Sequence, residues 1–280
     1  MKPRIRIALF AIPAIIGFTS YVLLSSRCAA APKSDNVNTK KEAVVLDIML
    51  RILHNAHFAP NEVNDNFSHK VFDTYLKRAD FNKKIILQSD VDELKAKYYD
   101  QIDDQVRAQT FEFFNRSSEI FIERIADDKV YVAEALAQPF DFTVKESVEL
   151  DPEKMGYAKD KAEAKENWRK YLKYQVMVRF IDAKKEQSDA IAKADSLKKP
   201  KDEIKIKTDA ELEADARAKV KKTQDDVFER LAKVDRQDRM ISYLNVISGI
   251  FDPHTEFFNP AGKDDFDIAW GNDPDADRHG

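Results

Sequence analysis

The sequence predicts a mainly α-helical fold, a multi-helix domain with at most minor short strands. Only six glycines occur in 280 residues, although phosphate-binding loops, nucleophile elbows and tight hairpins all depend on glycine. Charged residues of both signs make up 34% of the chain, which is typical of solvated helices. Apolar residues recur at helical spacing through most of the chain. Together these observations favour helices over sheets.

The N-terminus has the order of an export signal. Lys2, Arg4 and Arg6 precede an apolar run at 7–24, and small residues follow at 28–31. The run also suits a short membrane anchor, and Cys28 suggests a lipoprotein, although Arg27 stands where a small residue is expected. All three interpretations place the body in the periplasm, and the anchor interpretation attaches it to the inner membrane. We therefore treat 1–31 as a signal peptide or signal anchor and 32–40 as a polar tether.

Four amphipathic helices are expected between the tether and Pro139. Ser89 with Asp92, and Asp90 with Glu93, have capping-box spacing and open the third, while Pro139 ends the fourth. Residues 141–144 are expected to form a short strand or an extended connection. The four apolar stripes are Val45, Ile48, Met49, Ile52 and Leu53; Phe67, Val71 and Tyr75; Val91, Leu94, Tyr98, Ile102 and Val106; and Phe111, Phe114, Phe121, Ile122, Ile125, Val132 and Leu136.

Helices are expected again in the second half of the chain. A helix from Lys159 precedes the lysine-rich segment 183–207, whose few large apolar groups predict a mobile linker or a solvated helix hairpin. Thr208 and Glu211 form a capping-box pattern, and Asp235 can cap a last helix that ends by Pro253. The stripes are Trp168, Leu172, Val176 and Phe180; Leu212, Val220, Val227, Phe228, Leu231 and Val234; and Met240, Tyr243, Leu244, Ile247 and Ile250.

Several classes of function are disfavoured by composition. A net charge of −4 with interspersed signs offers no basic field for nucleic acid. The single cysteine, Cys28, leaves the body without a disulfide or a thiolate metal site. His54 and His57 are three apart, but a zinc site needs further ligands and a supporting shell. We therefore expect neither a metal nor another cofactor.

Other candidate residues are better explained structurally. His254 and the pair Asp252–Pro253 are expected at a helix exit rather than in acid–base catalysis. Adjacent carboxylates do not face one another on a helix, so we expect these pairs on solvated faces: Asp103–Asp104, Asp127–Asp128, Asp225–Asp226 and Asp264–Asp265. Phe111, Phe114 and Phe121 are expected in the core. Ser117, Ser118 and Ser248 lie inside predicted helices, where no backbone donors remain for an oxyanion hole.

Two segments resemble the tail-specific (carboxyl-terminal processing) serine proteases. The first contains Asp65-Asn66-Phe67-Ser68, Phe72-Asp73-Thr74-Tyr75-Leu76, Asp80-Phe81 and Leu87-Gln88-Ser89-Asp90-Val91. The second contains Tyr243-Leu244-Asn245 and Phe251-Asp252-Pro253-His254-Thr255-Glu256-Phe257-Phe258-Asn259-Pro260, and Pro139-Phe140-Asp141-Phe142 lies between them. The resemblance implies that 41–268 is the N-terminal helical domain of that family, with 183–207 as an insertion. It also implies a structural junction at Asp252, Pro253, His254 and Thr255. Residues 269–280 do not resemble the family, and we expect them to form a disordered tail.

The resemblance implies that this chain binds protein partners and does not itself catalyse cleavage. Members of the family are periplasmic endopeptidases that degrade proteins with apolar C-termini, using a PDZ domain and a serine activated by lysine. Neither pattern follows Pro260, so we expect a truncated or frame-shifted, inactive part that docks substrates or adaptors. Two alternatives remain: a stand-alone periplasmic scaffold or adaptor, and a split enzyme completed by a second chain. In each case the partner is a protein, with inner-membrane contact possible through 7–24.

Overall fold

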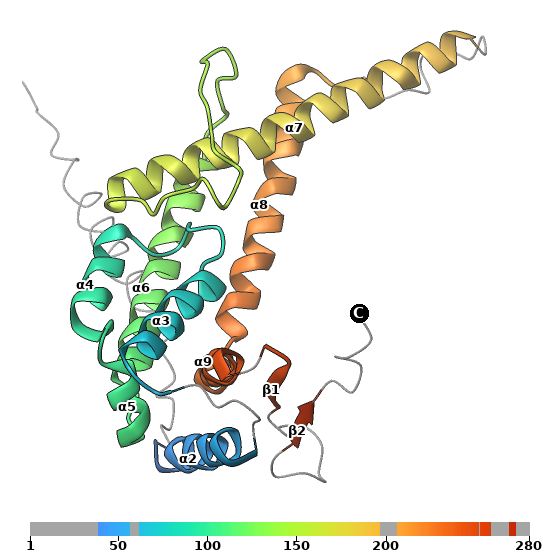
Figure 1. Ribbon diagram of the computed structural model, residues 1–280. Coiled ribbons are helices and arrows are strands. Elements are labelled where there is room, and N and C mark those ends of the chain that lie inside the picture. Colours follow the sequence, from blue (N-terminus) through green and yellow to red (C-terminus); the bar gives the residue numbers. More distant parts are fainter. Residues whose placement is uncertain (1–38, 57–61, 197–205, 252, 259–268, 273–280) are drawn as a thin grey trace, which may run out of the picture. The chain divides into compact units, whose positions relative to one another are not determined.

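The computed structural model describes residues 39–56, 62–196, 206–251, 253–258 and 269–272 (Figure 1). The expected export signal at 1–31 and most of the expected tether lie outside these ranges. The described residues are mainly helical, which confirms the predicted fold class. The elements are α2 (Thr39–Ala56), α3 (Asp65–Ala79), α4 (Gln88–Tyr98), α5 (Ile102–Ala108), α6 (Glu112–Ala135), α7 (Lys161–Ser196), α8 (Asp209–Lys233), α9 (Arg236–Phe251), β1 (Thr255–Phe258) and β2 (Ala269–Asn272).

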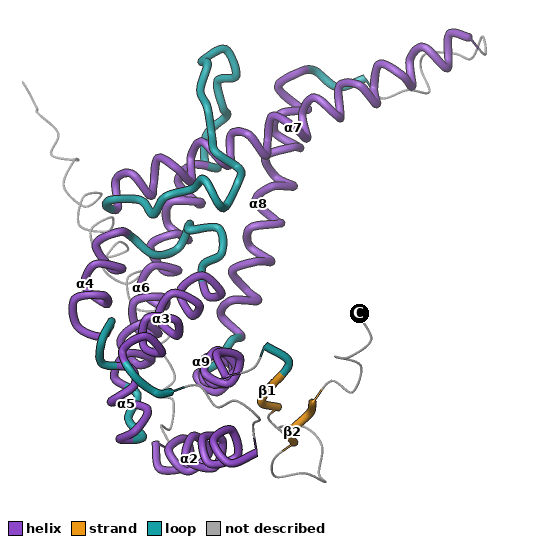
Figure 2. The backbone as a smooth tube through the Cα atoms, viewed as in Figure 1, coloured by secondary structure: helices purple, strands orange, loops and turns teal. Residues whose placement is uncertain are grey.

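Helix α6 takes part in two hydrophobic clusters, and Figure 2 shows it among the other helices. Its first half packs Phe113, Phe114 and Phe121 into a cluster with α2, α3, α4, α5, α9 and β1. Its last turn packs Val132 against Trp168 of α7 and the apolar face of α8. The two clusters therefore share one helix as a common support. The predicted core positions Phe111, Phe114 and Phe121 are all buried, as expected.

The predicted third helix is divided into α4 and α5 by a turn at 99–101. The backbone N–H of Asp103 donates to Ser68 Oγ at 2.8 Å, so a hydroxyl from α3 caps α5. Tyr99 in the turn stacks on His69 of α3, with 4.0 Å between ring centroids. These contacts with α3 stabilise the bend between α4 and α5. The spacing of apolar residues along the sequence does not show such contacts.

The caps are partly those predicted. At α8, the N–H of Glu211 donates to Thr208 Oγ1 and the N–H of Thr208 donates back to the Glu211 carboxylate, which confirms the capping box. At α9, Asp238 N–H donates to Asp235 Oδ1 at 2.9 Å. The predicted cap of α4 is wrong. The N-cap is Leu87, two residues before Ser89, and the N–H of Leu87 donates to Asp90 Oδ2.

Four further expectations need correction. The helix α2 begins at Thr39, so the end of the expected tether is helical. Residues 141–144 form a turn, not a strand, because Asp141 Oδ1 accepts the N–H of Thr143. Ile122 is exposed, since its neighbour Phe121 already faces the core. Residues 269–272, expected in a disordered tail, form β2, which pairs antiparallel with β1; 273–280 lie outside the described residues.

The lysine-rich segment is helical as far as it is described. Helix α7 continues to Ser196, so the linker interpretation is wrong for 183–196, and 197–205 lie outside the described residues. Lys184 of α7 pairs with Asp209 of α8 at 2.8 Å. The side-chain amide of Gln187 accepts the N–H of Lys207 and donates to the carbonyl of Lys207. In the parts of the chain that are described, the segment behaves as a solvated helix hairpin. No helix in these parts is both long and apolar enough to cross a bilayer.

Candidate functional site

The predicted junction is a short exit strand held against helix α9. Asn245 on α9 pairs with the backbone of Phe257 in β1 through both ends of its amide. The N–H of Phe257 donates to Asn245 Oδ1 at 2.5 Å, and Asn245 Nδ2 donates to the carbonyl of Phe257 at 3.1 Å. The side chain of Phe257 is buried in the cluster that α9 shares with α3 and α6. The strand is therefore fixed on its helix side by one side chain and on its other edge by β2.

A second contact fixes the turn between α9 and β1. Ser248 Oγ donates to the carbonyl of Thr255 at 3.1 Å, and both side chains are buried. Pro253 and His254 are exposed in the turn. Asp252 lies outside the described residues. Of the four predicted junction residues, Thr255 is buried and its carbonyl accepts from Ser248. The anchoring side chains, Asn245 and Ser248, stand outside the four predicted positions.

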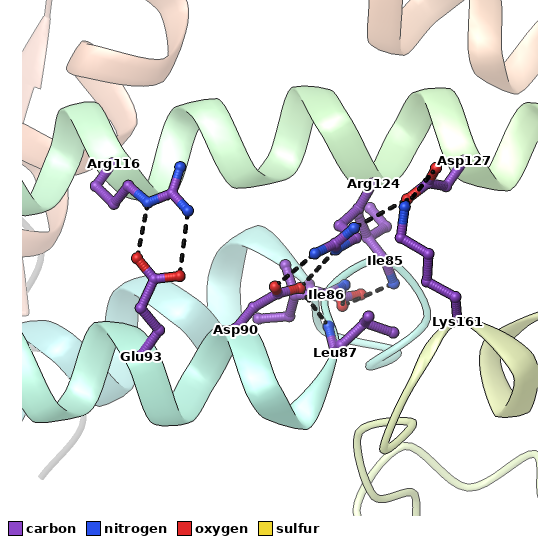
Figure 3. Close-up of polar contacts among 10 residues, drawn as sticks. Ile85, Ile86, Leu87, Asp90, Glu93, Arg116, Arg124, Asp127 and Lys161 are labelled. Atoms are coloured by element: carbon purple, nitrogen blue, oxygen red, sulfur yellow. Dashed lines mark hydrogen bonds and ion pairs between the residues drawn. The ribbon is translucent and has the colours of Figure 1, made fainter.

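Helices α4 and α6 are joined by a row of ion pairs, drawn in Figure 3. Arg124 of α6 binds Asp90 of α4 through two hydrogen bonds of 2.7 and 2.8 Å, and it also contacts Asp127 at 2.9 Å. Lys161 of α7 reaches Asp127 from the other side at 2.8 Å. Nearer the start of α6, Arg116 binds Glu93, and this pairing lowers the pKa of Glu93 to about 2. The row links three helices across the boundary between the two clusters.

Asp128 is a buried acid at the contact of α6 with α7. Its Oδ1 accepts the indole N–H of Trp168 at 2.8 Å, while its Oδ2 has no hydrogen-bond partner among the described residues. Burial raises the pKa of Asp128 to about 8, and the hydrogen bond from Trp168 only partly opposes this. At neutral pH the carboxyl group is therefore mostly protonated, which avoids an isolated charge in the interior.

The paired carboxylates do not all lie on solvated faces. Asp103 and Asp128 are buried, which corrects that expectation, whereas Asp225 and Asp226 are exposed. Asp103 binds Ser68 and shares Arg107 with Asp104, whereas Asp127 binds Arg124 and Lys161 and Asp128 binds Trp168. The pair Asp264–Asp265 lies outside the described residues. Local sequence could not show the burial, since the partners are far away in the chain.

The expected histidine and serine candidates do not come together. His54 is exposed on α2, and His57 lies outside the described residues. Within the described ranges, no group of three His, Cys, Asp or Glu side chains is placed to hold a metal ion. Ser117 and Ser248 each donate to backbone carbonyls. The described residues thus offer anchoring and ion pairing, and the row in Figure 3 contains no hydroxyl or thiol nucleophile.

Comparisons with known proteins agree with this arrangement. Residues 49–261 match the model of the tail-specific protease N-terminal domain. A tail-specific protease from Haemophilus influenzae is 26% identical over 208 residues, which cover 74% of this chain. The matched region is 26% of that relative, so the chain spans about a quarter of its length. The region 49–261 includes the second half of α2, all helices from α3 to α9 and the exit strand β1.

Proposed function

The chain belongs to the family of tail-specific protease N-terminal domains, and from this membership we propose that it is the substrate- or adaptor-docking part of a tail-specific serine endopeptidase. In this proposal the helices hold protein partners, and cleavage of proteins with apolar C-termini is carried out by other regions of the protease. The chain by itself is then not an enzyme.

The observation that supports this role is the anchored exit strand. Asn245 binds both backbone polar groups of Phe257, and Ser248 binds the carbonyl of Thr255. These contacts fix the direction in which the chain leaves the helical core. A docking part needs such a fixed exit, because a partner held on the helices must keep a defined position relative to the cleaving region.

A chimaera tests this role. The corresponding N-terminal quarter of the Haemophilus influenzae relative is replaced by this chain, and degradation of a reporter with an apolar C-terminal tail is measured. We expect degradation to be retained. A second chimaera carries Asn245→Ala, which leaves the helices intact but releases β1, and we expect slower degradation. An inactive first chimaera that is folded and secreted would contradict the proposal and favour a stand-alone scaffold.

We also propose that this function is carried out in the periplasm. Lys2, Arg4 and Arg6 precede the apolar run at 7–24, as in export signals. Alkaline phosphatase fused after residue 272 is expected to be active, because that enzyme needs the oxidising conditions outside the cytoplasm. A fusion that is made in full but inactive would contradict this location. Replacing the three cations by Glu should reduce the activity of the fusion.

A further inference from the structure

A hollow of about 280 Å³ lies between the loop after α3, the loop before α7 and the first turns of α7. Its lining includes Lys84 from the first loop, Gly156 and Tyr157 from the second, and Trp168 and Tyr171 from α7. Ligand pockets commonly enclose about 300 to 1,000 Å³. This hollow is at the lower limit, which suits a small molecule or a single residue of a chain.

The aromatic wall of the hollow is held in place by the buried acid. Trp168 donates its indole N–H to Asp128 at 2.8 Å, and Tyr171 packs edge-on against Trp168 with ring centroids 6.0 Å apart. Tyr157 also lines the hollow, with the Lys83 ammonium 5.9 Å from its ring centroid. A fixed indole and two phenol rings offer flat apolar surface, against which aromatic groups of a ligand pack well.

Lys84 supplies a positive charge to the hollow. Its ammonium lies 3.0 Å from the centroid of Tyr171 and 5.8 Å from that of Trp168. Among the described residues it has no carboxylate or carbonyl within hydrogen-bonding distance. Burial lowers the pKa of Lys84 to about 8, and the charge of Asp80 only partly opposes this. The Asp80 carboxylate is itself occupied by the N–H groups of Lys84, Ile85 and Ile86.

The other charged groups of the lining are already paired. Lys83 donates to the carbonyl of Met155 at 2.5 Å, and Lys154 pairs with Asp151. Glu149 accepts the N–H of Asp151, and Glu163 accepts the N–H of Lys159. Among the cations of this lining, Lys84 is therefore the one whose ammonium has neither a carboxylate nor a carbonyl partner among the described residues. A carboxylate placed there would form a charge-assisted hydrogen bond in a partly desolvated setting.

We propose that this hollow binds an aromatic carboxylate, with the ring between Tyr157, Trp168 and Tyr171 and the carboxylate on Lys84. The ligand is either a free aromatic acid or the C-terminal residue of a polypeptide, which present the same two groups. The site is separate from the exit strand, and its occupation does not depend on the proposed docking function.

Binding is measured on the full chain through the fluorescence of Trp168, in a Trp270→Phe background that leaves one indole. The probes are 3-phenylpropionate, N-acetyl-phenylalanine, a glycine–serine peptide that ends in phenylalanine, and N-acetyl-phenylalanine amide as the uncharged control. We expect saturable binding of at least one carboxylate, with the amide weaker by about tenfold or more, because it lacks the charged acceptor. If the peptide binds as tightly as N-acetyl-phenylalanine, the source is a chain end; if only the free acids bind, it is a small molecule.

Two variants and a control locate the site. Lys84→Met keeps the stem but removes the charge, and we expect carboxylate binding to weaken by about tenfold or more. Lys170→Met is the control, because Lys170 lines the same hollow but pairs with Glu166, and its effect should stay within about twofold. Gly156→Leu should weaken binding without altering thermal unfolding, since an added Cβ meets no atom within 4 Å. Absence of saturation for all three carboxylates below about 10 mM, equal binding of acid and amide, or unchanged binding by folded Lys84→Met would overturn the proposal.

Discussion

Arg124 and Asp90 join α6 to α4 through two parallel hydrogen bonds, from Nε to Oδ2 at 2.7 Å and from Nη2 to Oδ1 at 2.8 Å. The Asp90 side chain is 6% exposed and that of Arg124 is 15% exposed, so both charges are largely removed from water. Asp90 Oδ2 also accepts the N–H of Leu87 at the start of α4. One carboxylate thus caps a helix and fixes its neighbour.

Removing the buried cation should strongly destabilise the protein. Arg124→Met leaves Asp90 buried without its partner, and we expect a loss of about 3–5 kcal/mol in the free energy of unfolding. The matched control is Arg116→Met on the same helix, since Arg116 and Glu93 are each 31% exposed; its loss should be about 1 kcal/mol or less. Urea unfolding measures both. Equal losses would show that burial does not decide the strength of this row.

Asp128 should make stability depend on pH in an unusual direction. Burial raises its pKa to about 8 in the folded protein, whereas an unfolded Asp has a pKa of about 4. Between about pH 4 and pH 8 the unfolded chain releases a proton that the folded protein keeps, so this group lowers stability as pH rises. The slope is at most about 1.4 kcal/mol per pH unit.

Asp128→Asn tests that sign. An asparagine can still accept from Trp168 but does not titrate in this range. We expect the free energy of unfolding of the variant, relative to the natural protein, to rise between about pH 5 and pH 8. Glu123→Gln, an exposed change on the same helix, should give a difference that stays flat. A flat difference for Asp128→Asn as well would mean that its carboxyl is not kept protonated.

The sequence could predict features whose causes are local. The Thr208–Glu211 cap depends on residues within one turn, so its pattern indicated the right structure. The spacing of apolar residues likewise indicated the helix α6, although it wrongly included the exposed Ile122. The burial of Asp128 could not be predicted in this way, because Trp168 is forty residues away. The division between α4 and α5 likewise depends on Ser68, which is 35 residues from Asp103. Asn245 and Phe257 are only 12 residues apart in the sequence. Even so, nothing in the sequence around Asn245 distinguishes it from a solvated asparagine.

Releasing the exit strand should loosen it without unfolding the helices. Asn245→Ala removes both partners of the Phe257 backbone, and we expect a local loss of about 1–3 kcal/mol. Amide exchange at Phe257 should become faster, while exchange within α6 should not change. Asn82→Ala, at an exposed position, serves as the control. Faster exchange throughout the helices would mean that the strand is part of the global fold rather than a separately anchored exit.

The purified full chain should not cleave polypeptides. Covalent proteolysis needs an activated nucleophile and oxyanion donors. Buried Ser118 Oγ has no hydrogen-bond partner among the described residues, so no base activates it. Ser117 Oγ donates to the carbonyl of Phe114 at 3.0 Å, and Ser248 Oγ donates to that of Thr255. Both lie inside helices whose N–H groups are already used in the helix.

The assay compares this chain with the Haemophilus influenzae tail-specific protease on one reporter with an apolar C-terminal tail. We expect cleavage by the relative alone. Turnover by this chain that survives further purification and is lost on Ser117→Ala or Ser248→Ala would contradict the prediction. Turnover that those changes leave intact would instead point to another nucleophile, and replacing the remaining serines one at a time would then identify it.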